Sequence, residues 1–273
     1  MYYNMPITLF VNNDPSDSNT KVNAFGNQVT VSLNPAVHLD NKKEYVLRVL
    51  SAQVLYCFSN VFTGKNDKIY YAYKGGNYTI TFPQGIYTLA AINDEIIRQT
   101  NDNNNAPYIF SIQGDVANSS VYIVFNDPTL TVSCNHSDSI LINLGFPMST
   151  GIIGPYLEEG TQYSLGYPAV LNTTTSLLMS CDACSGSYKN GSTSSIVASI
   201  ILNSTPFITI EYEPINPPKI PLAKYDIDSI TFTLYNQRLQ PLDLNSNNGT
   251  QQYENWSAVI EIDEYDVKTG RLI

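Results

Sequence analysis

The sequence predicts an all-β globular protein, and two observations carry that prediction. The first is composition: 20 tyrosines and 10 phenylalanines favour pleated, half-buried strands, while 15 glycines and 15 prolines favour turns. The second is an alternation of apolar and polar residues with a period of two, which recurs along the chain. Hydrophobic residues make up 43% of the 273 positions, enough for the core of one large β domain, with or without an insertion, or of two small domains.

The sequence argues against two classes of partner: nucleic acid, because of its charge, and the membrane interior, because of its short apolar runs. Lys and Arg total 14 against 24 Asp and Glu, which gives a net charge of -10, and only 14% of residues are charged. Binding to duplex DNA draws most of its affinity from neutralised phosphates, so no nucleic-acid partner is expected. No apolar run approaches the roughly 18 residues of a membrane helix, so no membrane insertion is expected. The first six residues lack the basic and apolar regions of a secretory signal, although a signal already removed is left open.

Alternating segments mark the expected strands. Each reads as a strand with one face in the core and one face in water, and the six clearest are residues 29–33, 78–82, 121–125, 208–212, 230–234 and 256–262. In the last of them, Trp256 begins the apolar set and is expected in the core. Residues 45–56 are largely apolar on both faces, which indicates a central strand covered on both sides. Turn-forming clusters separate these segments, namely 12–19, 74–77, 185–195 and 245–250, and many short strands with such punctuation indicate a sandwich or a barrel.

One region breaks the alternation. Leu89, Ile92, Ile96 and Ile97 recur at helical spacing, and Thr88 is a suitable N-cap, so a helix is predicted over 88–100. A second, short helical turn is expected around 138–144. Residues 84–159 therefore read as a small α+β insertion, and residues 1–83 and 160–273 are expected to build one sandwich together. The four prolines between 214 and 221 predict a stiff extended connection and not a strand in the middle of a sheet.

Catalytic constellations find little support. The chain has no Gly-x-Ser-x-Gly elbow, no His-Glu-x-x-His, no phosphate loop and no Gly-x-Gly-x-x-Gly, and its two histidines are His38 and His136. His38 is interpreted as a surface or packing residue. A glycosidase needs only two carboxylates, but the sequence pairs none of the 24 available. The acidic tail is interpreted as a solvated strand face; it comprises Glu261, Asp263, Glu264 and Asp266. We therefore expect no catalytic residue and no cofactor.

The strongest metal candidate combines Cys181 and Cys184 with Cys134 and His136. Two thiolates of a Cys-x-x-Cys turn and two ligands from one strand face are the right types for zinc. The spacing between the halves matches no zinc motif, so four ordinary buried or edge residues are the favoured interpretation. A Cys181–Cys184 disulfide is the third alternative, favoured only outside reducing cytoplasm. Calcium at Asp14/Asp17 or Asp226/Asp228 stays open, but no EF-hand spacing exists, and the sequence predicts no metal site.

A run of tyrosines is the remaining candidate for binding. Tyr71 and Tyr73 are interpreted as amphipathic strand residues. Tyr70 is left open between that role and a platform for sugars or a protein partner.

Several short motifs follow one another in an order typical of one family. Residues 230–245, ITFTLYNQRLQPLDLN, are followed by WSAVIEI at 256–262; upstream lie FPQGIYTLAAIN at 82–93 and Leu-Gly-Phe at 144–146. Residues 177–181, 220–222 and 228–232 occur in the expected order. From about residue 45 to its end, the chain resembles the minor capsid (penton) proteins of virophages and Polinton-type elements.

That resemblance implies a structural protein. It implies a single jelly-roll β-sandwich with an inserted domain, assembled as a homopentamer at the five-fold vertices of an icosahedral double-stranded DNA virus or virophage. Its partner would be the major capsid protein, and its insertion could contact the host-cell surface. The protein would be assembled in host cytoplasm and reside in the virion, with no enzymatic activity. A chain of 273 residues is too short for a double jelly roll with loops.

Two other function classes stay open. One is a carbohydrate- or receptor-binding β-sandwich that mediates attachment, and the other is a jelly-roll hydrolase that uses two carboxylates. The assembly mass distinguishes them from a vertex protein. A five-fold ring needs a head-to-tail interface, so two different faces of each subunit should be adhesive.

Overall fold

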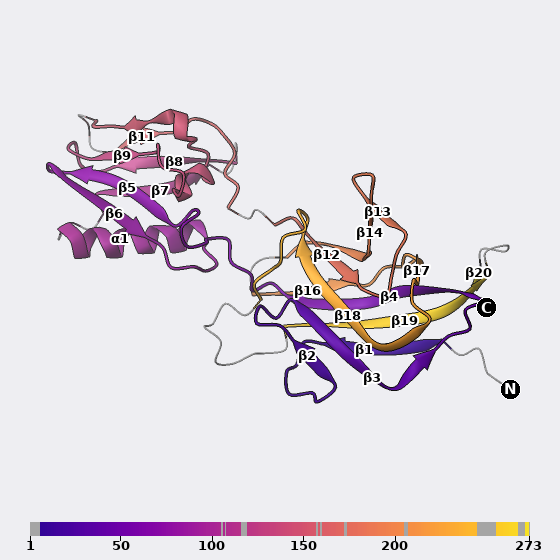
Figure 1. The fold of residues 1–273 in the computed structure, drawn as a ribbon. Helices are drawn as coiled ribbons and strands as arrows, with labels where there is room; N and C mark the ends of the chain where they lie inside the picture. Colours follow the sequence, from indigo (N-terminus) through magenta and orange to yellow (C-terminus); the bar gives the residue numbers. More distant parts are fainter. Residues whose placement is uncertain are drawn as a thin grey trace. The chain divides into compact units, whose positions relative to one another are not determined.

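The computed structural model describes residues 6–104, 106, 108–115, 119–156, 158, 160–171, 174–204, 207–244, 255–266 and 271–272. The chain divides into two compact units: unit 1 comprises Met1–Phe58 and Thr174–Ile273, and unit 2 comprises Ser59–Thr173 (Figure 1). The turn expected at 245–250 lies outside the described residues. Within the described part, no helix has both the length and the apolarity needed to cross a membrane.

Unit 1 contains two antiparallel sheets. The first sheet has the order β1 (Ile7–Asn12), β19 (Trp256–Asp266), β4 (Glu44–Leu55), β16 (Thr209–Tyr212), with β17 (Ile220–Pro221) also paired to β4 and β20 (Arg271–Leu272) to β19. The second sheet has the order β15 (Ile196–Ile201), β12 (Ser176–Cys181), β18 (Asp226–Asn236), β3 (Gln28–His38), β2 (Thr20–Val22). A hairpin of β13 (Ser187–Lys189) and β14 (Ser192–Ser194) completes the described strands of the unit.

The strand order and connections of these two sheets are those of a jelly roll. In chain order, the eight principal strands are β1, β3, β4, β12, β15, β16, β18 and β19. The first sheet then takes the first, eighth, third and sixth strands as neighbours, and the second sheet takes the fifth, fourth, seventh and second. Only the fourth and fifth strands are consecutive in the chain and paired, and all other connections cross between sheets. The predicted all-β jelly roll is confirmed, and unit 2 enters between its third and fourth strands, β4 and β12.

The core of unit 1 follows the alternation in the sequence. Trp256 is 2% exposed, and Ala258, Ile260 and Ile262 are buried with it, while Ser257, Val259 and Glu261 take the other face of β19. The indole Nε1 of Trp256 donates to the carbonyl oxygen of Gly26 at 3.0 Å. Trp256 is thus a core residue, as predicted. β4 pairs with β19 on one side and with β16 and β17 on the other, so it is an internal strand of its sheet, as expected. The expectation that both of its faces are covered is wrong, because one face carries Arg48, Ser51 and Gln53, and Gln53 is exposed.

Unit 2 has a separate core between two small sheets and a helix. One sheet has the order β10 (Ile152–Ile153), β9 (Thr131–Ser133), β5 (Lys68–Tyr73), β6 (Gly76–Thr81); the other has the order β11 (Thr161–Tyr163), β8 (Ser120–Phe125), β7 (Phe110–Asp115). Helix α1 (Leu89–Asn104) and the short 3₁₀ turns η1 (Ile140–Ile142) and η2 (Met148–Thr150) accompany them. The buried side chains of both sheets and of α1 form one apolar cluster.

The boundaries of the interruption differ from the expected 84–159. Residues 59–83 and 160–173 also belong to unit 2, because β5 and β6 pair with each other and with β9, and β11 pairs with β8. The jelly roll therefore retains 1–58 and 174–273, not 1–83 and 160–273. Alternation at 78–82 indicates a strand but does not say which sheet that strand joins, and this is why the sequence placed it wrongly.

The helix begins where the sequence predicts and ends later. The Oγ1 of Thr88 accepts a hydrogen bond from the amide of Ala91 at 3.2 Å, so Thr88 caps the first turn. The helix continues past residue 100 to Asn104, through polar residues that were expected to end it. The expected turn at 138–144 is the 3₁₀ turn η1. The proline-rich segment contributes only the two-residue strand β17, in keeping with an extended connection.

Candidate functional site on the outer face of the first sheet

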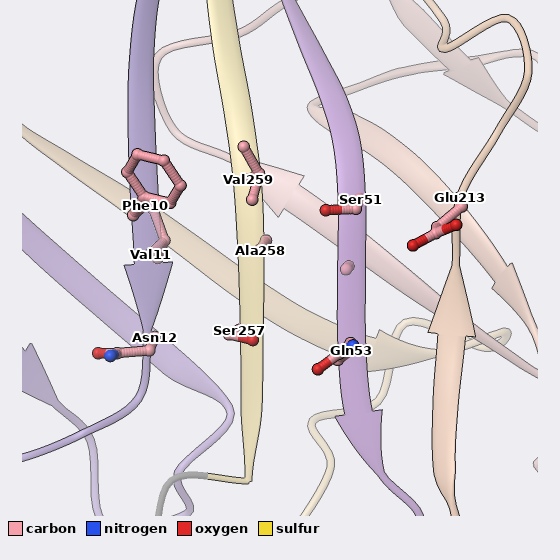
Figure 2. Close-up of a pocket in the computed structure, with 10 residues that line it drawn as sticks. Phe10, Val11, Asn12, Ser51, Gln53, Glu213, Ser257, Ala258 and Val259 are labelled. Carbon is pink, nitrogen blue, oxygen red and sulfur yellow. The ribbon is translucent and has the colours of Figure 1, made fainter.

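The outer face of the first sheet of unit 1 has an open hollow of about 360 Å³. Figure 2 shows side chains from three neighbouring strands, β1, β19 and β4, around it, with Glu213 beyond the end of β16. Because alternate residues of a strand point to the same side, the polar-phase residues of these strands line the hollow. The hollow is therefore built by the face of the sheet that points away from the core.

The strand register arranges these residues in two rows across the sheet. In one row, Asn12 lies opposite Ser257, Ser257 opposite Gln53, and Gln53 opposite Glu211. The second row is two residues away along each strand. There Phe10 lies opposite Val259 and Val259 opposite Ser51, while Glu213 follows two residues after Glu211 (Figure 2). The small residues Val259 and Ser51 thus form a floor between an aromatic ring and a carboxylate.

The polar groups around the hollow have few partners within the protein. Among the described residues, the side chains of Ser51, Gln53, Ser257 and Glu213 make no hydrogen bond or ion pair. The Oδ1 of Asn12 accepts from the amide of Asp14 at 3.3 Å, which leaves the Asn12 side-chain NH₂ group without an acceptor among them. The ring of Phe10 is 79% exposed. The hollow therefore presents uncommitted donors and acceptors beside an exposed aromatic face.

A cluster of charges adjoins the hollow on the same face. Arg48 Nη2 on β4 donates to Glu261 Oε1 and, at 2.6 Å, to Asp263 Oδ2, both on β19. Burial, followed by the neighbouring Asp263, raises the pKa of Glu261. Lys43 Nζ lies 2.7 Å from Glu264 Oε2. The interpretation of this tail as a solvated face is wrong: the side chains of Glu261, Asp263 and Glu264 are only 15%, 8% and 12% exposed, because basic residues of β4 and of the turn before it lie against them.

The cysteines and His136 do not form one group. Cys134 is buried in the core of unit 2, whereas Cys181 and Cys184 are buried in the core of unit 1, and all three are free thiols. Burial raises the pKa of the Cys134 thiol to about 12, and a hydrogen bond from Cys181, together with burial, raises the pKa of Cys184. Within the described ranges, no three His, Cys, Asp or Glu side chains are placed to hold one metal ion. The absence of a metal in the working protein stays a prediction.

His136 instead stacks on Tyr70, with ring centroids 3.7 Å apart. The Tyr70 hydroxyl donates to Asp138 Oδ2 at 3.0 Å, and Lys68 Nζ lies 2.8 Å from the same carboxylate oxygen. This network attaches the loop after β9 to strand β5. Tyr70 thus has a structural role in unit 2, which is one of the two alternatives left open from the sequence.

The other candidates have ordinary partners. Tyr71 and Tyr73 are buried, as expected for strand residues of the sheet. His38 Nδ1 lies 2.9 Å from Asp226 Oδ1, and both side chains are well exposed. The Asp14 carboxylate accepts from the Ser16 amide at 2.8 Å, and Asp17 accepts in the same way from Asn19 at 2.9 Å, so both serve as turn residues.

The hollow was not predicted from the sequence, although the sequence contains one signal for it. In the segment Ile7–Asn12, Leu9 and Val11 point toward the core, so Phe10 occupies a position in the polar phase of the alternation. An aromatic residue in that phase indicates an exposed ring. Ser51, Gln53 and Glu213 had no such signal, because only the register brings them near Phe10.

Comparisons with known proteins give matches among solved structures only. No family model matches the chain, and no curated protein matches it. Among solved structures, the chain is similar to the crystal structure of a mavirus penton protein, at 11% sequence identity and a TM-score of 0.47, over 96% of this chain and 92% of that one.

Proposed function

We propose that this protein is a non-enzymatic structural subunit of a viral capsid, and that five copies form a ring at an icosahedral vertex next to the major capsid protein. The proposal rests first on the sequence motifs and on the jelly-roll wiring of unit 1. It also accounts for the composition, 14% charged residues with 20 tyrosines, since protein–protein interfaces combine polar rims with aromatic anchors.

The residues that carry the family resemblance support the fold and not a chemical site. Ile230, Phe232 and Leu234 of the first motif are buried in β18. Leu242 and Leu244 of its Pro-Leu-Asp-Leu segment are buried in the same core, next to an isolated bridge between Tyr235 and Pro241. Because these motif residues pack the core, the motifs define the fold and indicate no chemical site, in keeping with a structural protein.

The single observation that favours a ring is the exposure of apolar side chains on two opposite edges of unit 1. At one edge of the second sheet, Phe25 in the turn between β2 and β3 is 53% exposed. At the opposite edge, Ile201 at the end of β15 is 72% exposed, and Phe207, just before β16, is 71% exposed. Cyclic assembly joins two different surfaces head to tail, and these two edges are different surfaces.

Native mass spectrometry of the purified protein, alone and with the major capsid protein, tests the proposal. We expect five copies for the wild type, and monomers for Phe25→Asp and for Ile201→Asp, because each variant loses one of the two surfaces. A mixture of the two variants should give 1:1 heterodimers, because each retains the surface that the other lacks. Ile152→Asp, at a similarly exposed site in unit 2, is the matched control and should stay pentameric.

Other outcomes would contradict the proposal in distinct ways. A wild type that is monomeric under both conditions excludes the ring. Homodimers of either single variant would show that one surface binds to itself, which a five-fold ring does not allow.

A further inference from the structure

We propose that the hollow on the outer face of the first sheet binds a neutral saccharide. The inference goes beyond the proposed assembly and does not depend on it, because the ring edges at Phe25 and Ile201 are separate from the hollow residues. It rests on the lining of the hollow: one exposed aromatic ring, two amides, two hydroxyls and one carboxylate, most of them uncommitted within the described part of the chain.

The lining excludes other ligand classes by their chemistry. A phosphate or carboxylate would meet Glu213, and no Lys or Arg lines the hollow to offset that repulsion. A purely apolar ligand would cover Gln53 and the two serine hydroxyls without giving them hydrogen-bond partners, which is costly. A cation would use Glu213 and the ring of Phe10, but it would offer nothing to the NH₂ groups of Asn12 and Gln53. A ligand rich in hydroxyls satisfies all of them, because each hydroxyl both donates and accepts.

The arrangement of the groups also suits a sugar ring. Neighbouring strands lie about 4.8 Å apart, and alternate residues of one strand lie about 6.8 Å apart. The polar row of Asn12, Ser257 and Gln53 therefore lies about 6.8 Å from the floor residues Val259 and Ser51, a distance that one sugar ring can span. Phe10 stands at one end of that floor and offers an apolar surface to the C–H face of a sugar. A hollow of about 360 Å³ lies at the lower end of small-molecule sites, which favours one or two sugar units.

The charge cluster beside the hollow is not part of the site. Both carboxylates of Glu261 and Asp263 bind Arg48, so they are committed within the protein. They mark the limit of the hollow along β19. The sugar would contact the segment of the sheet from Phe10 to Asn12 and from Ser51 to Gln53.

Saturation-transfer NMR with methyl glycosides of glucose, galactose, mannose and N-acetylglucosamine tests the inference on the full chain. We expect the wild type to bind at least one of them with a Kd on the order of 1 mM, and Phe10→Ala to weaken that binding about tenfold. Phe25→Ala removes an exposed ring elsewhere on unit 1 and should leave binding unchanged. Thermal melts of both variants should match the wild type, since both rings are exposed.

Charge separates a sugar from a cationic ligand. Glu213→Gln keeps the shape of the side chain and replaces one acceptor oxygen by an NH₂ donor. A sugar hydroxyl can pair with either, so glycoside binding should stay within about threefold of the wild type. Binding of tetralysine with no response to any glycoside would overturn the inference in favour of a basic peptide. No glycoside response at all, or a response that Phe10→Ala leaves unchanged, would also overturn it. None of these results depends on whether the protein forms pentamers.

Discussion

The strands of the two units differ in length. Unit 1 uses long ladders: β3, β18 and β19 have 11 residues each and β4 has 12. Among the described strands of unit 2, none exceeds six residues, and side-chain amides of helix α1 supply part of the pairing. Short strands bury less backbone per element, so unit 2 needs the additional hydrogen bonds more than unit 1 does.

Helix α1 supplies those hydrogen bonds at two sheet edges. There, a side-chain amide of the helix binds the backbone N–H and C=O of one edge residue, as a neighbouring strand would. The side-chain amide of Asn93 donates to the carbonyl of Ile112 at 2.5 Å and accepts from the Ile112 amide at 2.7 Å, at the edge strand β7. Gln99 does the same for Thr81 on the edge strand β6, at 2.7 Å and 2.9 Å. Two amides from one helix thus bind one residue on each of the edge strands β7 and β6, edges that could otherwise pair with another chain.

Unit 1 leaves its edges unpaired. In the part of the chain that the structure describes, no strand pairs with the outer sides of β1, β2, β15 or β16. An unpaired edge is a template for contact with another molecule. Under the proposed assembly, the edges of unit 1 are available to a neighbouring subunit. In unit 2, helix α1 lies at the edges β6 and β7, whereas no described strand pairs with the outer sides of β10 and β11.

The largest expected effect concerns the core of unit 1. Trp256→Ala should lower the free energy of unfolding of unit 1 by about 3–5 kcal/mol, because it removes a buried indole together with its hydrogen bond to Gly26. Calorimetry should show the loss in one transition, with the transition of unit 2 unmoved. Trp256→Phe should lose less. An unchanged melting profile would mean that the assigned register of β19 is wrong.

The next effect tests the amide contacts of unit 2. Asn93→Ala should destabilise unit 2 by about 2 kcal/mol, because both backbone groups of Ile112 lose their partner. Hydrogen exchange of the amides of β7 measures the loss. The chain has one tryptophan, in unit 1, so its fluorescence follows unit 1 alone and should report unchanged unfolding. Asn93→Asp keeps the acceptor but sets a carboxylate oxygen against the Ile112 carbonyl, so it should also destabilise unit 2; unchanged stability of either variant would contradict the double contact.

The smallest effect is a pH dependence on the outer face of unit 1. The pKa of Glu261 is raised above 4.5, so this carboxyl favours folding below that pH, and its contribution is lost as the pH rises through the raised value. Glu261→Gln should remove that loss and raise stability at pH 7 by less than about 1 kcal/mol. Urea denaturation between pH 4 and 7, followed by Trp256 fluorescence, compares the two proteins. Parallel curves of unfolding free energy against pH for the wild type and Glu261→Gln would contradict this expectation, because they would show that Arg48 fully compensates the charges of Glu261 and Asp263.

Local patterns in the sequence predicted much of the fold. Alternation assigned Trp256 to the core, and helical spacing with Thr88 as a cap predicted where α1 begins. Both features depend on residues close together in the chain, and their periods are set by backbone geometry. The hollow could not be predicted in this way, since Phe10, Ser51 and Ser257 belong to three strands that only pairing brings together.

By itself, the sequence determined the class of the fold, the faces of its strands and the position of its one long predicted helix. Tertiary structure alone decided that residues 59–83 pair within unit 2, that Arg48 meets Glu261 across 213 positions of the chain, and that Asn93 and Gln99 close two sheet edges. The physical reason is that strands far apart in the sequence compete to pair with the same sheet edge, and only the folded arrangement decides which of them pairs. A period of two says which way a side chain points, but not which strand lies beside it.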